Sequence, residues 1–221
     1  MKLIYLDIEG SLVTIKSMFK ATFDYYGVKY TARDFAYDNM YGISEQVMRN
    51  LDISKALDKK PEPAHLSFPN YTFDKNSVDI LNMIYDKHKC AYIIIGQFSK
   101  LTISQLNLLF RINGVHGVVI GKTKPILPSL CYTKKYYEGE TILTHMAVNN
   151  PDISKCCIIT HNDTEIKPLF NDITVKIDPR SGLVVQDLSQ IEKTFLVNFS
   201  HYDVIHSLND INTNTQTPWI C

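Results

Sequence analysis

Two carboxylates near the start of the chain are the residues best placed to do chemistry. An apolar run, Leu3–Leu6, ends at Asp7, and Glu9 follows two positions later, ahead of Gly10 and Ser11. In an open α/β sheet, ligands bind outside the carboxyl ends of the strands, so a buried strand that ends in an acid is typical of an active site. In an extended segment, residues two apart point to the same side, which would present both carboxylates to one ligand. The alternative is a strand followed by an acidic turn without a catalytic role.

The elements that must position these acids follow the same arrangement, in which a short apolar run ends at a polar or glycine-containing turn. Runs without alternation are typical of strands buried on both faces of a parallel sheet. The further strand candidates are Ala91–Ile95, Val115–Ile120, Cys156–Ile159 and Ile173–Ile177. Helical patterns with an apolar stripe occur at Ser77–His88, Lys100–Ile112 and Gly139–Asn149. Strands that alternate with helices predict a doubly wound α/β fold around a parallel sheet.

Residues 14–70 do not follow this alternation and are predicted to form a helical insertion after the first strand. Helix-like stretches occur at Lys16–Tyr26 and Ser44–Leu51. An insertion at this point could cover the strand ends as a lid, or its helices could pack beside the sheet. Its tyrosines either form a surface for a protein partner or pack against one another in a small core of the insertion. They are Tyr25, Tyr26, Tyr30, Tyr37 and Tyr41. Residues 199–221 are polar and are predicted to form a C-terminal tail.

The composition suits one domain with an insertion. The chain has 221 residues, of which 45% are hydrophobic, enough for a sizeable core. Its 23 basic and 23 acidic residues cancel, which argues against a general basic surface for long nucleic acid. Five cysteines, an odd number, indicate a reducing compartment without a disulfide framework. Because the sequence has neither the pattern of a signal peptide nor a membrane-length apolar run, we expect a cytoplasmic protein without a membrane partner.

Six segments in order carry a resemblance to a known family. They are LDIEGSL (6–12), IIIGQFSK (93–100), VVIGKTKP (118–125), EGETI (138–142), IITHNDTEI (158–166) and DPRSGLVVQD (178–187). Together they resemble the motifs of the haloacid dehalogenase-like (HAD) superfamily, most closely the HAD domain of Swiss Army Knife RNA repair proteins. The resemblance implies a Rossmann-like HAD core at 1–13 and 71–198, with residues 14–70 as a cap-like insertion.

The resemblance also implies a reaction. In active members the first acid is a nucleophile that takes a phosphoryl group, and the second protonates the leaving oxygen and later activates water. This assigns Asp7 as nucleophile and Glu9 as acid and base. The family holds Mg²⁺ between the nucleophile, a backbone carbonyl and acids of the fourth motif, which implies Asp7 and Asp163 as metal ligands.

The family binds the phosphate through its second and third motifs. The corresponding residues are Gly96 and Gln97 after the second strand and Lys122 and Lys124 after the third. The resemblance therefore implies these four as the substrate-binding residues.

Several motif positions depart from the family pattern. Glu9 is one methylene longer than the usual Asp, Gly96 stands where the family has a hydroxyl residue, and Glu138 stands where the branch has an Arg. His161 and Asn162 replace an Asp-Asp pair at the fourth motif. An imidazole and an amide are poor partners for a hard cation such as Mg²⁺.

Two functions are therefore left open. In the first, the chain is a Mg²⁺-dependent phosphomonoester hydrolase that forms an aspartyl-phosphate on a small phosphorylated molecule, a nucleotide or a nucleic-acid end. In the second, it is a catalytically inactive HAD-fold protein, a pseudoenzyme, which binds a nucleotide-like ligand or a protein partner through residues 14–70.

Overall fold

The fold is taken from a computed structural model, which describes residues 1–14, 17, 72–123, 137–149, 151–164, 166 and 170–196. The side chains of Gln97, Lys100, Tyr137, Glu138 and Ile153 are not described. Almost all of the predicted helical insertion, the whole of the predicted tail and Lys124 lie outside the described residues. The predictions for those parts of the chain therefore stay predictions.

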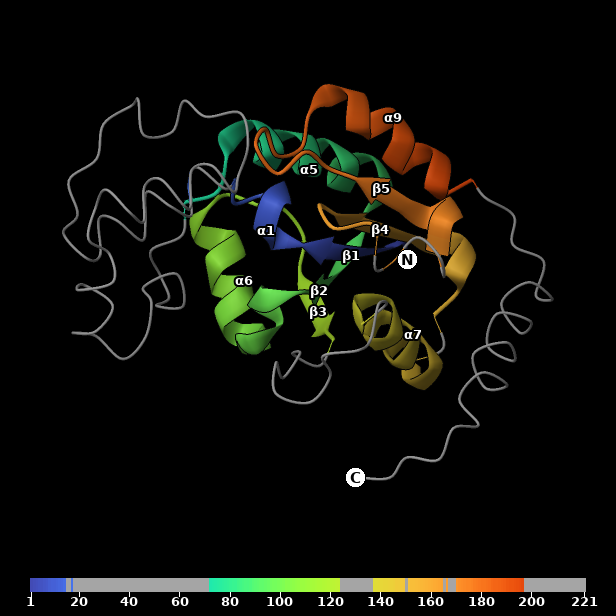
Figure 1. The fold of residues 1–221 in the computed structure, drawn as a ribbon. Helices are drawn as coiled ribbons and strands as arrows, with labels where there is room; N and C mark the ends of the chain where they lie inside the picture. Colours follow the sequence, from blue (N-terminus) through green and yellow to red (C-terminus); the bar gives the residue numbers. More distant parts are fainter. Residues whose placement is uncertain are drawn as a thin grey trace, which may run out of the picture.

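The described residues form a five-stranded parallel sheet with the order β3-β2-β1-β4-β5 (Figure 1). The strands are β1 (Leu3–Asp7), β2 (Ala91–Ile95), β3 (Val119–Lys122), β4 (Cys156–Thr160) and β5 (Thr174–Lys176). The predicted doubly wound α/β fold is confirmed, and it is Rossmann-like. The strand that carries Asp7 lies at the centre of the sheet, where both neighbours can contribute side chains to its carboxyl end.

The register of the sheet brings three chain segments to one edge. Asp7 pairs with Ile95, so the loop that starts at Gly96 lies beside the end of β1. On the other side Leu6 pairs with Ile159, so Thr160 and the residues after it lie next to Asp7. The turns that follow β1, β2 and β4 therefore meet at the carboxyl edge of the sheet, as expected for an α/β ligand site.

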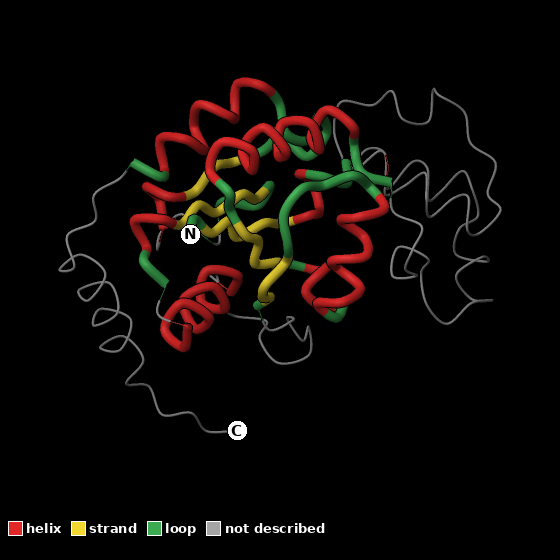
Figure 2. Tube along the Cα trace, turned by 180° about the vertical axis from the view of Figure 1, so that it is seen from behind, coloured by secondary structure: helices red, strands yellow, loops and turns green. Residues whose placement is uncertain are grey.

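Helices cover both faces of the sheet. One face packs against α5 (Lys75–His88), α6 (Ile103–Ile112) and α9 (Val185–Thr194). The other packs against α7 (Tyr137–Asn149), which lies across the sheet from α5 and α9 in both views of the chain (Figures 1 and 2). Burial on both faces explains why the strands read as continuous apolar runs. Helix α9 was not among the predicted elements.

Alternate residues of the central strands enter separate cores. Ile4 and Leu6 of β1 lie in the core under α5, α6 and α9, whereas Tyr5 lies in the core under α7. The hydroxyl of Tyr5 lies 3.2 Å from Nδ1 of His145 on α7, which satisfies its hydrogen-bonding group inside the core. The end of β1 is thus anchored from both sides.

The prediction for the third strand is wrong in its position. The predicted strand Val115–Ile120 begins later, and β3 runs over Val119–Lys122. The residues before it are held in turns by Gly114 and Gly117, whose φ angles are +73° and +90°. Both values lie in the left-handed region that glycine enters without a steric cost. The shift matters for the site because it puts Lys122 at the carboxyl end of β3.

The helix predicted at Lys100–Ile112 also begins later, at Ile103. The backbone of η3 (Gln97–Lys100) forms a short 3-10 turn, and a capping box then starts α6. In that box, Thr102 Oγ1 accepts from Gln105 N at 3.2 Å, and Gln105 Oε1 accepts from Thr102 N at 2.9 Å. Two further 3-10 turns are η4 (Ile153–Lys155) and η5 (Asn171–Ile173).

The described cysteines are part of the core. Cys90, Cys156 and Cys157 are buried and free. Burial raises the pKa of the Cys156 and Cys157 thiols to about 12, so they stay protonated and unreactive at neutral pH. In the described part of the chain, no helix combines the length and apolar character needed to cross a bilayer.

Candidate active site

The candidate site begins where β1 ends. The regular strand ends at Asp7, and the chain then bends through the short segment α1 (Ile8–Ser11), in which Glu9 (φ −65°, ψ 129°) and Gly10 (φ +78°) are not helical. The prediction that Asp7 and Glu9 lie in one continuous extended segment is therefore wrong, because the strand is interrupted at Ile8. The turn is closed by Gly10, whose N–H donates to the carbonyl of Val13 at 2.9 Å. Asp7 is left at the floor of the carboxyl edge, with 2% of its surface exposed.

Gly10 is required at this turn for two independent reasons. Its φ of +78° lies in the left-handed region, which other residues enter only with strain. A Cβ atom at this position would also lie 2.7 Å from Cβ and 2.8 Å from Cγ of His161. The backbone of the turn therefore lies directly against the imidazole ring.

The carboxylate of Asp7 is held by the two residues at the end of β4. His161 Nδ1 lies 2.8 Å from Asp7 Oδ2, and Thr160 Oγ1 donates to the same oxygen at 3.3 Å. Burial raises the pKa of Asp7 above its ordinary value, because the charged form loses its water. The hydrogen bond and charge of His161, the Thr160 hydroxyl and the backbone N–H of Glu9 oppose this rise.

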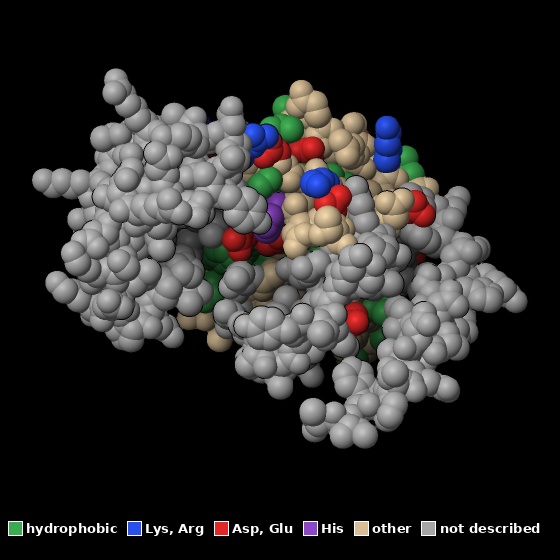
Figure 3. Space-filling view, in the orientation of Figure 1, with side chains coloured by type: hydrophobic (Ala, Val, Ile, Leu, Met, Phe, Trp, Pro, Cys, Tyr) green, Lys and Arg blue, Asp and Glu red, His purple; other side chains and the backbone are tan. Residues whose placement is uncertain are grey.

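One ring atom of His161 serves two oxygens. Besides Asp7 Oδ2, Nδ1 lies 3.0 Å from the backbone carbonyl oxygen of Glu9. A carbonyl only accepts hydrogen bonds, so Nδ1 carries the hydrogen and is the donor to both oxygens. The side chain of His161 is 24% exposed, so the ring sits between the buried carboxylate and the surface. In the space-filling view, histidine and acidic side chains lie next to each other on this face (Figure 3).

Glu9 is the second carboxyl of the site. Burial is the main cause that raises its pKa, and the nearby charge of Asp7 raises it further, whereas His161 lowers it. A carboxyl with a raised pKa keeps its proton closer to neutral pH, which is what a general acid needs. The structure thus brings Asp7, Glu9 and His161 into one interacting group.

Asp163 also lies at this edge, but its carboxylate is paired. It is 6% exposed, and its Oδ1 lies 2.8 Å from Nζ of Lys176 at the end of β5. The loop that carries it is fixed by the Asn162 N–H, which donates to Thr160 Oγ1 at 3.0 Å. Opposite charges at this distance satisfy each other in a partly buried setting.

The described residues do not fit a Mg²⁺ site. Mg²⁺ prefers near-octahedral oxygen ligands, and carboxylates are its usual protein donors. Within the described ranges, no group of three or more His, Cys, Asp or Glu side chains could hold a metal ion. The two predicted ligands are engaged elsewhere, Asp7 with His161 and Asp163 with Lys176. Their assignment as metal ligands stays a prediction.

The predicted phosphate-binding residues lie on the other side of Asp7. Gly96 has φ +70° and ψ −152°, and its carbonyl accepts from both the N–H and the hydroxyl of Ser99, at 3.2 and 2.7 Å. Lys122 Nζ donates to the carbonyl of Leu101 at 2.7 Å, which fixes its ammonium group at the carboxyl edge. Gly96 and Lys122 thus share the edge with Asp7, on the neighbouring strands β2 and β3. The side chain of Gln97 and all of Lys124 lie outside the described residues.

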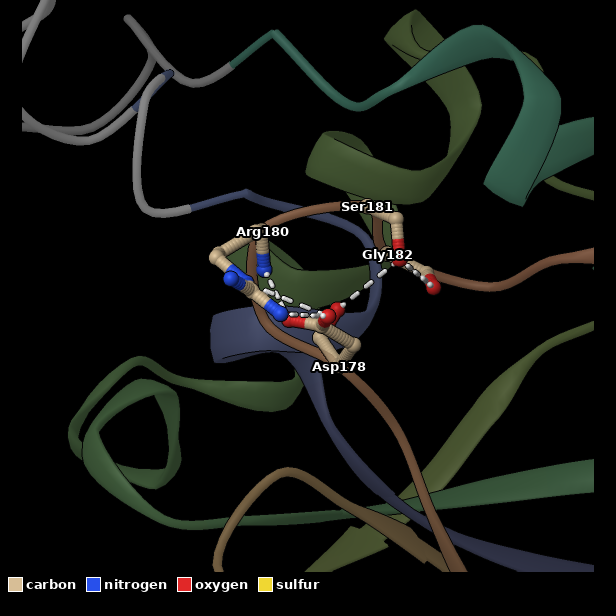
Figure 4. Close-up of polar contacts among 4 residues, drawn as sticks. All are labelled: Asp178, Arg180, Ser181 and Gly182. Carbon is tan, nitrogen blue, oxygen red and sulfur yellow. Dashed lines mark hydrogen bonds and ion pairs between the residues drawn. The ribbon is translucent and has the colours of Figure 1, made fainter. Parts of the chain in front are cut away.

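The turn at 178–183 is hydrogen-bonded to α1 and so helps to position the site. Arg180 holds the Asp178 carboxylate through Nε at 3.0 Å and Nη2 at 2.7 Å (Figure 4). The N–H of Gly182 donates to the Asp178 carbonyl at 3.0 Å. The next N–H, of Leu183, donates to the carbonyl of Ser11 at 3.2 Å. Since Ser11 Oγ in turn donates to the Asp7 carbonyl, this turn positions α1 and with it the end of β1.

Thr160 was missed as a site residue. It is the last residue of β4, a buried strand whose neighbours in the sheet cannot be read from the sequence. Only the pairing of β4 with β1 reveals that its hydroxyl reaches the Asp7 carboxylate. The available signal was its position as a hydroxyl residue directly after an apolar run.

Comparisons with known proteins give structural neighbours only. No protein-family model matches the chain, and no curated protein matches it significantly. Similar solved structures include a proposed beta-phosphoglucomutase from Thermotoga maritima, at 12% identity, TM-score 0.46 and coverage of 96% of this chain and 100% of the other. They also include a haloacid dehalogenase-like family hydrolase from Streptococcus pneumoniae, at 13% identity, TM-score 0.39 and coverage of 97% and 99%.

A third neighbour is a hydrolase from Pseudomonas syringae, at 12% identity, TM-score 0.36 and coverage of 96% and 99%. Identities this low do not establish a shared function. The relationship to Swiss Army Knife RNA repair proteins is not tested by these neighbours and stays a prediction.

Proposed function

We propose that the chain is a HAD-like phosphomonoester hydrolase in which Asp7 is the nucleophile. The observation that supports this most strongly is the buried carboxylate of Asp7 at the carboxyl end of the central strand, gripped on one oxygen by Thr160 and His161. Both of these contacts fall on Oδ2, and we assign Oδ1 as the oxygen that attacks. A nucleophile held in a fixed orientation and shielded from bulk water loses little entropy on reaching the reactive geometry.

The proposed reaction has two steps. In the first, a bond forms between Asp7 Oδ1 and phosphorus while the ester P–O bond breaks, and the leaving oxygen takes the proton of Glu9. In the second, a water molecule gives a proton to the Glu9 carboxylate and attacks the phosphorus, which releases inorganic phosphate and restores Asp7. The raised pKa of Glu9 suits the first step, since the residue must enter it protonated.

We propose a small phosphorylated molecule as the substrate class. Lys122 stands at the carboxyl edge on β3, where it can meet the negative charge of a phosphate. The balanced net charge of the chain argues against a long nucleic acid, although a nucleotide or a nucleic-acid end remains within the proposal.

The test is release of phosphate from an aryl phosphate such as p-nitrophenyl phosphate. Wild type and Asp7→Asn are compared with and without added Mg²⁺, and each variant is checked for folding by circular dichroism. We expect turnover by wild type and background rates for Asp7→Asn. Equal turnover by both proteins would overturn the role of Asp7.

A second candidate function is ligand binding without turnover. It is favoured by the contact between His161 and Asp7, because a hydrogen bond at 2.8 Å to Oδ2 withdraws charge from the carboxylate and makes its other oxygen a weaker nucleophile. In that case phosphorylated ligands raise the melting temperature of a protein that hydrolyses none of them. Docking of a protein partner through residues 14–70 stays a prediction, because almost all of those residues lie outside the described part of the chain.

A further inference from the structure

A single nitrogen lies between two oxygens at the centre of the site. His161 Nδ1 is 2.8 Å from Oδ2 of Asp7 and 3.0 Å from the backbone carbonyl oxygen of Glu9. A nucleophile carboxylate and a backbone carbonyl are the two kinds of oxygen that the resemblance assigns to Mg²⁺, together with an acid at the position of His161 itself. The residue that replaces a metal ligand thus contacts the groups that would bind the metal.

We propose that the imidazole of His161 takes the place of the metal cation, so that the site around Asp7 does not bind Mg²⁺. The N–H of the ring bridges Asp7 and Glu9 and supplies the positive end of a dipole where a cation would otherwise lie. This inference goes beyond the proposed hydrolase function, and it holds whether or not Asp7 turns over a phosphoester.

The His161 ring packs directly against the turn after β1. Gly10 lies so close to His161 that a Cβ atom there would approach the ring atom Cγ to 2.8 Å. The φ of Gly10, +78°, is what folds the backbone of the turn against the ring. Thr160 supports the arrangement from the same strand end, because its hydroxyl donates to Asp7 Oδ2 and accepts from the N–H of Asn162. The ring is therefore positioned by Gly10, by Asp7 Oδ2 and by the carbonyl of Glu9.

Asp163, the remaining acid among the described residues of the loop, is already paired. Asp163 is directed to Lys176, with 2.8 Å between Oδ1 and Nζ, and its side chain is only 8% exposed. Freeing it for a metal would leave the Lys176 ammonium without this partner. Mg²⁺ also gives up its water reluctantly and binds imidazole poorly. Both predicted ligands, Asp7 and Asp163, are thus satisfied by protein cations or donors.

The inference is tested by direct metal binding. Wild type and His161→Asp are titrated with Mg²⁺ by calorimetry and with Mn²⁺ by electron paramagnetic resonance, at millimolar metal concentrations. We expect no saturable binding to wild type. His161→Asp removes the ring and adds a carboxylate beside the two oxygens, and it should bind both ions at least about tenfold more tightly. Asp7→Asn in the His161→Asp background should abolish this binding.

Two results would overturn the inference. One is saturable Mg²⁺ binding by wild type that is lost in Asp7→Asn or Asp163→Asn, which would make these residues the metal ligands. The other is a folded His161→Asp protein that binds metal no better than wild type. If His161→Asp fails to fold, His161→Asn takes its place. It removes the ring from between the two oxygens, so we expect it to bind metal more tightly than wild type, although less tightly than a carboxylate at this position would, because an amide is the poorer Mg²⁺ ligand.

The metal readout separates this inference from the proposed function. An inactive wild type with the expected metal titrations would remove the hydrolase and leave the role of His161 intact. An active wild type that binds Mg²⁺ through Asp7 would do the reverse.

Discussion

Nδ1 of His161 lies 2.8 Å from Oδ2 of Asp7, although the two residues come from the ends of different strands. The contact exists because β1 and β4 are neighbours in register, and it connects the first and fourth motifs of the chain directly. Asp7 is 2% exposed, so the carboxylate depends on this donor and on Thr160 for its solvation. The site is therefore one interacting group whose members determine each other's chemistry.

Removal of the imidazole is expected to destabilise the protein. In His161→Ala, the Asp7 carboxylate loses its strongest donor in a buried setting, and we expect a loss of about 3 kcal/mol in the free energy of unfolding, measured by urea denaturation. His116→Ala is the matched control, since His116 lies 3.4 Å from Asp86 with both side chains more than half exposed. It should change stability by less than about 0.5 kcal/mol. Losses of equal size in the two variants would contradict the coupling of His161 to a buried carboxylate.

The contact between the His161 ring and the turn after β1 can be tested at Gly10. Gly10→Ala forces a Cβ both into a φ of +78° and against His161 at 2.7 Å. Gly114→Ala is a control with a similar φ, +73°, and nothing within 4 Å of the added atom. We expect Gly114→Ala to lower the free energy of unfolding by about 1 kcal/mol and Gly10→Ala to lower it by at least about 2 kcal/mol more, as measured by urea denaturation. Similar costs at the two glycines would show that the ring does not lie against the turn.

Stability should depend on pH through Glu9. Because its folded-state pKa is raised, the folded protein holds a proton that the unfolded chain has already released. The stability contributed by protonated Glu9 is present below its ordinary pKa of 4.5 and is lost as the pH rises through the raised value. Wild type should therefore lose stability relative to Glu9→Gln as the pH rises from about 4 to 7, measured by urea denaturation.

Asp178 provides a control of the opposite sign. The hydrogen bond from Arg180 holds its pKa below the ordinary value, so its contribution is present at higher pH and is lost as the pH falls. As the pH rises, the free energy of unfolding of wild type should increase slightly relative to that of Asp178→Asn. The increase is small because this side chain is 44% exposed. If both variants shift in the same direction, the assigned pKa of Glu9 is wrong.

Lys122 should act on binding rather than on the chemical step. It stands at the carboxyl edge on β3, and its removal takes away charge that attracts a phosphate. We expect Lys122→Ala to raise KM for an aryl phosphate about tenfold with little change in kcat. The control is Lys155→Ala, which removes a lysine just before β4, at the opposite end of the strands, where it pairs with Asp152. A fall in kcat with unchanged KM in Lys122→Ala would place the lysine in the reaction itself.

The sequence alone predicted the elements whose two faces are both apolar. β2 was predicted with its observed bounds, and β1 and β4 nearly so, since continuous buried runs leave little choice of register. β3 was misplaced because Gly117, inside the predicted strand Val115–Ile120, lies in a turn with positive φ, which the apolar pattern does not reveal. Helix α9 was missed because its buried side chains include Asp187 and Thr194 beside Ile191, so its apolar stripe is short.

The candidate site was predicted in part for the same reasons. Asp7 follows a recognisable strand, so its position at the carboxyl edge could be anticipated. The contact of His161 with Asp7 and Glu9 depends on the pairing of β1 with β4 and on the turn at Gly10. Neither is local in the chain. Thr160 escaped notice because a hydroxyl at a strand end has many roles until its neighbour is known.

The most direct test of the account is a crystal structure of wild type grown with vanadate, a mimic of the phosphoryl group in transfer. We expect vanadium at bonding distance from Oδ1 of Asp7, with the His161 ring still in contact with Oδ2 and with the Glu9 carbonyl. Vanadate bound away from Asp7, or a metal ion between Asp7 and Glu9 in place of the ring, would contradict it.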